Sequence, residues 1–115
     1  MSVVIFHNPR CSKSRQTLQL LQDNGVEPEV VEYLKTPPTK ARLKQVLNML
    51  GLTPRQLMRH KETEYKEQGL ADEALTDEQL IDAMLATPKL IERPIVINGD
   101  KAAIGRPPEN VLEIL

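Results

Sequence analysis

A single cysteine, Cys11, stands among polar and cationic residues near the start of the chain. The thiolate form of cysteine is the nucleophile, and nearby positive charge favours thiolate over thiol. Four neighbours supply charge or hydrogen-bond donors: His7, Arg10, Lys13 and Arg15. A lone cysteine is often an inert buried side chain, but an inert thiol would have apolar neighbours. We therefore expect Cys11 to react as a nucleophile.

The elements that must position Cys11 also suit an anion. The apolar residues 3–6 predict a buried strand, which an Asn-Pro pair ends. Helix-forming sequence follows from about Ser14 to Asn24, so Cys11 lies where a loop enters a helix. Unpaired N–H groups and the positive end of the helix dipole meet at such a point. We expect an oxyanion to bind there. Ser12 and Ser14 are expected to cap the helix and to donate hydrogen bonds to the bound oxyanion.

The two histidines do not extend this site into a hydrolase or a metal centre. His7 is too close to Cys11 in sequence to be the base of a Cys–His hydrolase, which comes from a distant part of the chain. Two roles stay open for His7: it stabilises the thiolate as imidazolium or hydrogen-bond donor, or it shapes the turn. His60 is expected at the surface. One cysteine and two separated histidines make a poor metal site, so we expect no bound metal.

Length and composition favour one small domain without nucleic-acid or membrane partners. At 115 residues the chain is expected to form a single domain, residues 1–115. A net charge of −1 and only three aromatic residues argue against nucleic-acid binding. No apolar run approaches the ~20 residues that span a bilayer, and the N-terminus lacks a signal-peptide pattern. The single cysteine excludes an internal disulfide, which fits a cytoplasmic protein.

Hydrophobic patterning predicts the remaining elements. A second strand at Val30-Val31 completes a βαβ unit with parallel strands. Helical spacing follows over residues 43–50, and Gly51 ends that helix. A capping box at Thr53 opens a short helix to about Arg59. Charged residues 60–73 are expected to form an exposed connection, in which a helical turn can occur. A second capping box at residues 76–79 opens a helix that closes at Thr87-Pro88.

The C-terminal part predicts a β-hairpin and a helix. Residues 95–97 read as a strand, and Asn98-Gly99 is the favoured pair for a type I′ turn. Residues 101–104 would return as an antiparallel edge strand. A last helix is expected to follow, with Val111, Leu112 and Leu115 directed inward.

The segment from His7 to Leu18, His-Asn-Pro-Arg-Cys-Ser-Lys-Ser-Arg-Gln-Thr-Leu, resembles the active-site motif of glutaredoxin-dependent arsenate reductases, the ArsC family. The family usually has Gly-Thr where this chain has Ser12-Lys13. The resemblance covers essentially the whole chain and implies an α/β, thioredoxin-like fold, β-α-β then β-β-α, with a helical insertion between the halves. Such folds usually place a cis-proline opposite the cysteine, at the position of Pro94, although propensity alone favours a trans bond.

The resemblance also implies a set of substrate-binding arginines. The family uses three arginines, which correspond here to Arg59, Arg93 and Arg106. Arginine forks suit the oxygens of a tetrahedral dianion such as arsenate. From the sequence alone, a substrate-binding role is best supported for Arg93 and Arg106, because both adjoin the ends of the predicted hairpin.

The absence of a second cysteine bears on the source of electrons. A Cys-x-x-Cys pair is lacking, so no thiol of this chain can resolve an adduct on Cys11. As the resemblance implies, Cys11 attacks arsenate, glutathione enters as cosubstrate, and glutaredoxin reduces the adduct to arsenite. We expect a monomer without a bound cofactor. The alternatives are a regulator resembling Spx, which docks on RNA polymerase and commonly uses Cys-x-x-Cys, or a reductase of another oxyanion.

Overall fold

The computed structural model describes residues 3–115, and the chain forms two compact units. The first unit comprises Met1–Thr36 and Arg93–Leu115, and the second comprises Pro37–Glu92. The second unit therefore enters the sequence between the two parts of the first. The order of elements, β-α-β, then helices, then β-β and a final helical segment, agrees with the order expected from the sequence.

A four-stranded mixed sheet forms the first unit. Its elements are β1 (Val3–Phe6), α1 (Ser12–Asp23), β2 (Glu29–Val31), β3 (Ile95–Asn98), β4 (Lys101–Ile104) and the 3₁₀ helix η2 (Pro108–Ile114). The strands lie in the order β2-β1-β3-β4. β1 pairs with β2 in parallel and with β3 antiparallel, and β3 pairs antiparallel with β4. The predicted βαβ unit and hairpin are thus both present.

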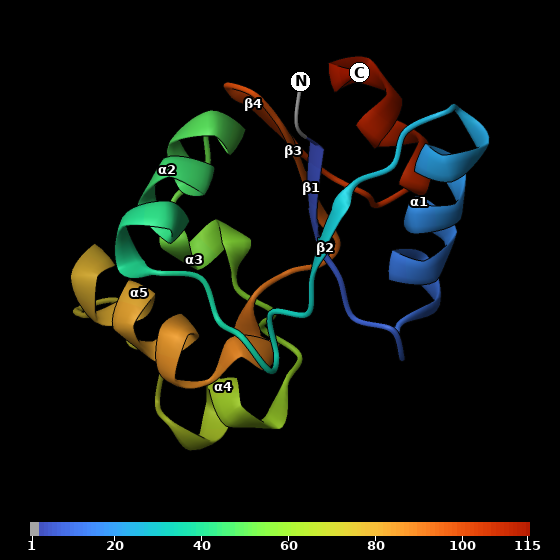
Figure 1. Ribbon diagram of the computed structural model, residues 1–115. Helices are drawn as coiled ribbons and strands as arrows, with labels where there is room; N and C mark the ends of the chain where they lie inside the picture. Colours follow the sequence, from blue (N-terminus) through green and yellow to red (C-terminus); the bar gives the residue numbers. More distant parts are fainter. Residues whose placement is uncertain (1–2) are drawn as a thin grey trace. The chain divides into compact units, whose positions relative to one another are not determined.

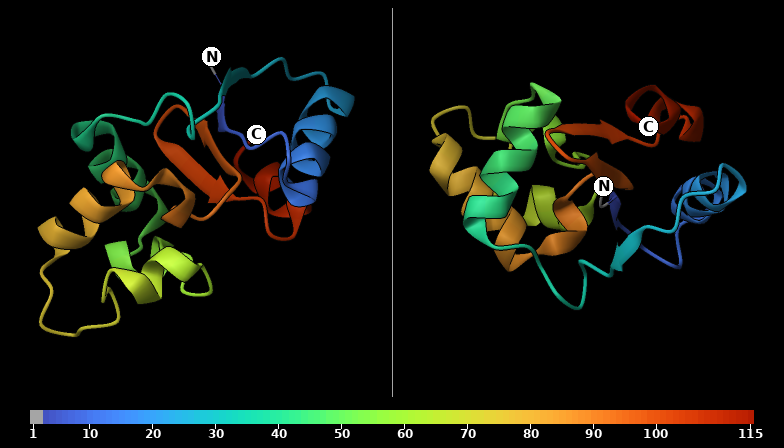
Figure 2. Two further views of the ribbon diagram at one scale, coloured as in Figure 1. Left: turned by 90° about the horizontal axis from the view of Figure 1, so that it is seen from below. Right: turned by 45° about the horizontal axis from the view of Figure 1, so that its top comes forward.

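The core of the first unit lies on one face of this sheet. Figures 1 and 2 show α1, in blue, and η2, in red, on the same side of the strands. Ile5 and Val96 are opposite each other in β1 and β3, so their side chains share that face. They pack with Leu21 of α1 and Val111 of η2, and all four residues are completely buried. This packing fixes α1, and with it the start of the helix, against the sheet.

Three details of the first unit differ from the sequence-based expectation. α1 begins at Ser12 rather than near Ser14, so Cys11 adjoins the helix directly. The hairpin turn consists of Gly99 and Asp100, because Asn98 pairs with Lys101. Only Gly99 has positive φ (64°), which is the pattern of a type II′ turn rather than the expected type I′ turn.

The final helix is the third difference. It is a 3₁₀ helix, whose side chains repeat every three residues, so Pro108, Val111 and Ile114 share a face. Val111 is buried as expected. Leu112 and Leu115, which were expected to point inward, are 39% and 45% exposed. The prediction for these two leucines was wrong because it assumed α-helical spacing.

The second unit is helical. It contains α2 (Lys40–Leu50), α3 (Pro54–Leu57), α4 (Thr63–Glu67), α5 (Asp77–Ala86) and the 3₁₀ helix η1 (Pro88–Leu90). Both predicted capping boxes are present, at Thr53 and at Thr76. Gly51 ends α2 with φ of 67°, as expected for a left-handed C-cap. Buried side chains of α2 and α5, among them Val46 and Met84, form its core.

Residues 60–73 are more ordered than the sequence suggested. They contain α4, and Tyr65 and Leu70 are buried, so the segment is not a wholly exposed connection. α3 is also shorter than expected and ends at Leu57. The following residue, Met58, forms an isolated antiparallel bridge with Ile91. Among residues 3–115, no helix is long and apolar enough to cross a membrane.

Candidate active site

A tight turn of residues 8–11 leads from β1 into α1. The Cys11 N–H donates to the Asn8 carbonyl at 3.0 Å, and Asn8 Oδ1 accepts the Arg10 N–H at 3.0 Å. Arg15 of α1 reaches back and donates from Nη1 to the Pro9 carbonyl at 3.0 Å. The turn is therefore held both by its own hydrogen bonds and by the helix that follows.

Cys11 is the N-cap residue of α1. Its backbone is extended (φ −94°, ψ 124°), and its side chain makes no capping hydrogen bond. The thiol is 9% exposed. N–H groups of the first helical turn and the positive end of the helix dipole stabilise negative charge at this position, and the first turn contains no acidic residue. The expectation that Cys11 lies where a loop enters a helix is confirmed.

The guanidinium of Arg106 lies beside the thiol. Its Nη2 is 3.6 Å from Cys11 Sγ, and its Nε donates to the Arg93 carbonyl at 2.8 Å. The Asn110 side chain in turn donates to the Arg106 carbonyl at 3.1 Å. The structure thus brings Arg106 and Cys11 together across almost the whole length of the chain, as the sequence analysis anticipated for Arg106.

Close packing next to Arg106 depends on a glycine. A Cβ on Gly105 would lie 2.5 Å from Thr17 Oγ1 and 2.8 Å from Pro94 Cγ, too near for any side chain. The Gly105 N–H also donates to the Pro94 carbonyl at 2.9 Å. Because only glycine allows this approach, Gly105 lets the chain just before Arg106 pack against Thr17 of α1 and Pro94.

Arg93 lies at the entry to β3. Its carbonyl orients Arg106, and its side-chain Nε and Nη1 atoms are almost completely buried. The Arg93-Pro94 peptide bond is cis, as the thioredoxin-like resemblance implies and propensity alone does not. The Arg106-Pro107 bond is also cis, which the sequence analysis did not anticipate.

His7 and Ser14 form a buried pair behind the turn. His7 Nδ1 is 2.7 Å from Ser14 Oγ, which also accepts the Asn8 N–H at 3.0 Å. Burial lowers the pKa of His7; the Glu32 carboxylate opposes this effect, and Arg15 adds to it. The neutral imidazole is therefore the favoured form at pH 7, which suits a hydrogen-bonding role better than an imidazolium. The catalytic role of His7 stays a prediction.

The expectation that Ser12 and Ser14 cap the helix was wrong. Cys11 occupies the N-cap position, and no side chain caps α1. Ser12 is the first residue of the helix and is exposed, whereas Ser14 is completely buried and engaged with His7. Donation from either hydroxyl to a bound anion stays a prediction.

Arg59 belongs to the second unit. Its Nη1 is 2.7 Å from Glu62 Oε1, and its Nε is 3.7 Å from Glu92 Oε1. Its backbone N–H donates to the Leu90 carbonyl at 2.7 Å. These contacts place Arg59 in a local ion-pair cluster, and its role in binding substrate stays a prediction.

The part of the chain that the structure describes contains no group of three or more His, Cys, Asp or Glu residues that could hold a metal ion. Sequence reasoning missed two features of the site. It did not foresee the close approach that Gly105 permits. It also gave no role to Glu32 and Lys35, which line a cavity with residues of the Cys11 turn. No local pattern in the sequence signals either feature.

The sheet order, the cis-proline before β3 and a cysteine at the N-terminus of α1 define a thioredoxin-like thiol protein. The ArsC family pattern matches residues 6–114, and the chain belongs to the ArsC family. The expected fold class is confirmed by a solved structure of "Arsenate reductase from Vibrio cholerae". That protein has 55% identity and a TM-score of 0.97, with coverage of 100% of this chain and 98% of that one.

Two relatives known by sequence are also similar along their whole length. YfgD of Escherichia coli K12, whose name assigns no activity, is 61% identical over 114 residues, which cover 98% of this chain and 96% of YfgD. An arsenate reductase of Haemophilus influenzae is 50% identical over 116 residues, with both chains covered completely.

Proposed function

We propose that this protein is an arsenate reductase in which Cys11 is the nucleophile. The observation that carries the proposal is the position of Cys11 Sγ, at the N-terminus of α1 and 3.6 Å from the Arg106 guanidinium. This combination favours a thiolate and a tetrahedral oxyanion at the same place. The names of the relatives from Haemophilus influenzae and Vibrio cholerae support arsenate as the substrate.

The first step forms a sulfur–arsenic bond. The Cys11 thiolate attacks arsenic(V), and one arsenate oxygen leaves as water after protonation. Arg106 stabilises the charge on the remaining oxygens, and Arg93 and Arg59 are proposed to share that task. The exposed Ser12 and the buried Ser14 are proposed as further donors to the anion. His7 maintains the turn through its contact with Ser14, which keeps the thiol in place.

Reduction requires electrons from outside the chain, because Cys11 is the only cysteine. Glutathione displaces a second oxygen as water and forms its own sulfur–arsenic bond. A glutaredoxin thiolate then attacks the glutathione sulfur and forms a mixed disulfide. The electron pair of the broken sulfur–arsenic bond stays on arsenic, which becomes arsenic(III). Water cleaves the remaining bond to Cys11, and arsenite and the free thiol are released.

The proposed setting follows from this chemistry. A free thiol that relies on glutathione and glutaredoxin suits a reducing compartment, so we propose a cytoplasmic protein. We propose that the monomer is the active form, because Cys11, Arg93 and Arg106 all come from one unit of one chain.

The test is multiple-turnover arsenite production by the whole protein. We expect turnover with glutathione plus glutaredoxin, and little or none with thioredoxin plus its reductase, because no second thiol of this chain can form a disulfide with Cys11. The matched control is Cys11→Ser, which keeps the shape of the site and should abolish turnover while far-UV circular dichroism stays unchanged.

Faster turnover with thioredoxin would contradict the proposed electron donors. If a folded protein with a reactive Cys11 turned over arsenate in neither system, the proposed activity would be wrong. The Spx-like regulator and a reductase of another oxyanion would then be the alternatives to examine.

A further inference from the structure

The Cys11 turn also forms one wall of a cavity of about 270 Å³. His7, Asn8, Pro9 and Arg10 line it on one side, and Glu32, Leu34 and Lys35, which follow β2, line it on the other. Its volume is near the lower limit of about 300 Å³ for small-molecule pockets. A compact ligand of a few residues is therefore a suitable occupant.

Two positive charges and one negative charge line this cavity. Arg10 and Lys35 each supply a positive charge, and Glu32 supplies a negative one. Lys35 and Glu32 form only a 3.6 Å ion pair, and their side chains are 79% and 43% exposed. Such an exposed pair contributes little, so a ligand can replace it at low cost. Leu34, which is 42% exposed, adds an apolar surface.

We infer that this cavity is the site where glutathione binds before it attacks the arsenic adduct on Cys11. The inference rests on the proposed function and adds a binding site for the thiol cosubstrate. Glutathione carries two carboxylates and one ammonium group, which complement two cations and one carboxylate. Glu32 binds the ammonium group, Arg10 and Lys35 bind the carboxylates, and Leu34 contacts the methylene groups of the γ-glutamyl chain.

The position of the cavity suits that attack. Asn8 lines the cavity, and its carbonyl accepts the Cys11 N–H at 3.0 Å, so the cavity wall and the nucleophile belong to one β-turn. Arg10 precedes Cys11 directly, which puts their Cα atoms about 3.8 Å apart. We place a tripeptide in the cavity with its central thiol extended along this turn toward an arsenic atom on Cys11 Sγ, the sulfur that Arg106 contacts.

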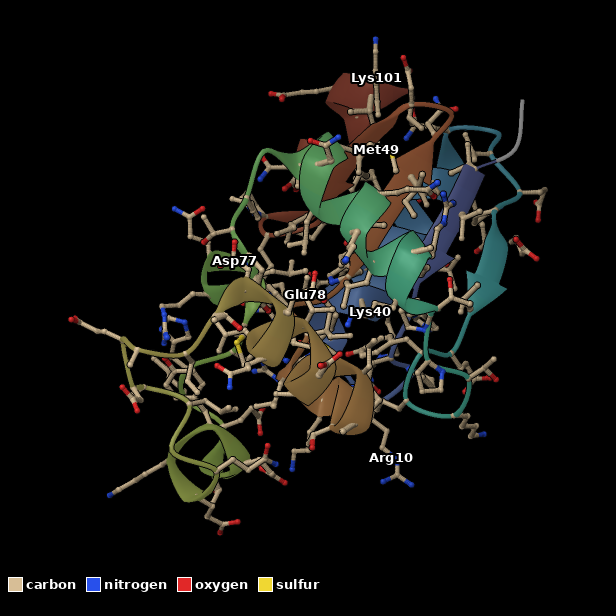
Figure 3. All side chains as sticks on the ribbon, turned by 90° about the vertical axis from the view of Figure 1, so that its left-hand side faces the viewer. Arg10, Lys40, Met49, Asp77, Glu78 and Lys101 are labelled. Atoms are coloured by element: carbon tan, nitrogen blue, oxygen red, sulfur yellow. The ribbon has the colours of Figure 1, made fainter. Side chains whose placement is uncertain are left out.

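The first test measures how the rate of arsenite production depends on glutathione at saturating arsenate and glutaredoxin. Lys35→Glu should raise the KM for glutathione about five- to tenfold, because it replaces an attraction with a repulsion. The KM for arsenate should stay unchanged. The matched control is Lys101→Glu, which makes the same charge change on β4 and should leave both constants unchanged. Figure 3 shows Arg10 and Lys101 at opposite ends of the view.

A second comparison assigns the ammonium group to Glu32. Glu32→Gln with glutathione and the wild-type protein with N-acetylglutathione should each raise the KM for the thiol several-fold. Combined, the two changes should raise it no further, because both remove the same contact. Fully additive effects would overturn the assignment.

Binding is also measured without any arsenate, by amide chemical shifts of the isotope-labelled protein titrated with S-methylglutathione. Shifts at Asn8, Arg10, Leu34 and Lys35 would support the cavity, even if the protein failed to reduce arsenate and the proposed function were wrong. If the protein reduces arsenate but Lys35→Glu leaves the KM for glutathione unchanged, the proposed function stands and the cavity is not the glutathione site. Absent shifts, or shifts confined to other residues, would also overturn the inference.

Discussion

Two lysines of α2 in the second unit and two arginines near Cys11 in the first unit have different kinds of partner. In the second unit, lysines of α2 pair with carboxylates of α5: Lys40 Nζ lies 2.6 Å from Glu78 and 3.0 Å from Asp82, and Lys44 Nζ lies 2.6 Å from Glu78. In the first unit, Arg15 and Arg106 donate to backbone carbonyls. The lysines are held by ion pairs with carboxylates, whereas these hydrogen bonds to carbonyls orient the guanidinium groups.

The lysines of α2 connect two helices, whereas Arg15 and Arg106 are positioned next to the Cys11 turn and its thiol. The pairs between α2 and α5 lie at the surface, where solvent screens them. The Arg106 guanidinium is directed at Cys11 Sγ by a hydrogen bond to a neutral group. Positive charge therefore lies 3.6 Å from the Cys11 sulfur, where it favours the thiolate.

The largest expected effect concerns the arginines. Arg106→Ala should lower kcat/KM for arsenate about ten- to hundredfold, equivalent to the ~1.5–3 kcal/mol of a hydrogen bond to a charged group. Arg93→Ala should have a similar effect. Lys44→Ala, which removes a carboxylate-paired cation, is the control and should not change kcat/KM.

Arg59→Ala sharpens the comparison, because Arg59 is paired with carboxylates of the second unit. If Arg59→Ala lowers kcat/KM for arsenate as much as Arg106→Ala does, an arginine that is paired with carboxylates can also bind the substrate. Normal activity in all three arginine variants, measured on folded protein, would refute the proposed anion site.

The next effect concerns the glycine beside Arg106. Gly105→Ala should lower the free energy of unfolding by about 1–3 kcal/mol in urea denaturation, because its methyl group would overlap Thr17 Oγ1 and Pro94 Cγ. Adding Thr17→Ala should restore part of that loss. Thr17→Ser keeps a γ-oxygen, the nearer of the two Thr17 atoms, and removes only Cγ2 at 3.0 Å, so it should restore less. Equal recovery with both substitutions would mean that the overlap is not the cause.

A smaller effect concerns the pH dependence of stability. Burial lowers the pKa of His7 below 6.5, so the unfolded chain takes up a proton at a higher pH than the folded one. The stability that the protein retains with His7 neutral is fully present above pH 6.5, and it is lost as the pH falls through the lowered pKa of His7 in the folded protein. The difference in unfolding free energy between pH 7.5 and pH 5 should therefore be smaller in His7→Gln than in the wild type. A larger difference in the variant would reverse the assigned direction.

The smallest effect concerns the second unit. Lys40 and Lys44 lower the pKa of Glu78 to about 2, so its contribution to stability is present above pH 4.5 and lost as the pH falls toward 2. Glu78→Gln should be slightly less stable than the wild type at pH 7, and the difference should vanish at pH 2 or in 1 M salt. Arsenate reduction should be unchanged. A salt-independent difference would show that Glu78 acts through packing.

Local patterns predicted most of the fold. Both capping boxes, the glycine that ends α2 and the βαβ unit depend on neighbouring residues, and the sequence displays them directly. The type of the final helix was harder to predict, because a buried Val111 fits α-helical and 3₁₀ spacing equally well. The exposure of Leu112, which α-helical spacing would direct inward, distinguishes the two. The hairpin turn was misplaced by one residue because Asn98-Gly99 and Gly99-Asp100 both suit a tight turn.

The site was predictable in its residue types and less so in its contacts. Cys11 at a helix start follows from sequence, because the preceding turn and the following helix are local features. The contact of Cys11 with Arg106 needs the pairing of distant strands, so the position of Arg106 at the end of the predicted hairpin and the family resemblance could only suggest it. The cavity beside Glu32 could not be predicted, since it depends on how the chain after β2 lies against the Cys11 turn.

The β3–β4 hairpin has a further consequence for how this chain tolerates insertions and deletions. Its pairing continues one step beyond the strands, from the Gly105 N–H to the Pro94 carbonyl, and the Arg106 side chain donates to the Arg93 carbonyl, so both arginines lie at the open end of the hairpin. Residues added at the Gly99 turn lengthen the closed end and leave the arginines opposite each other. A single deletion within either strand shifts every pair and turns side chains to the wrong face of the sheet. Length variation in this hairpin is therefore compatible with the site only at its tip.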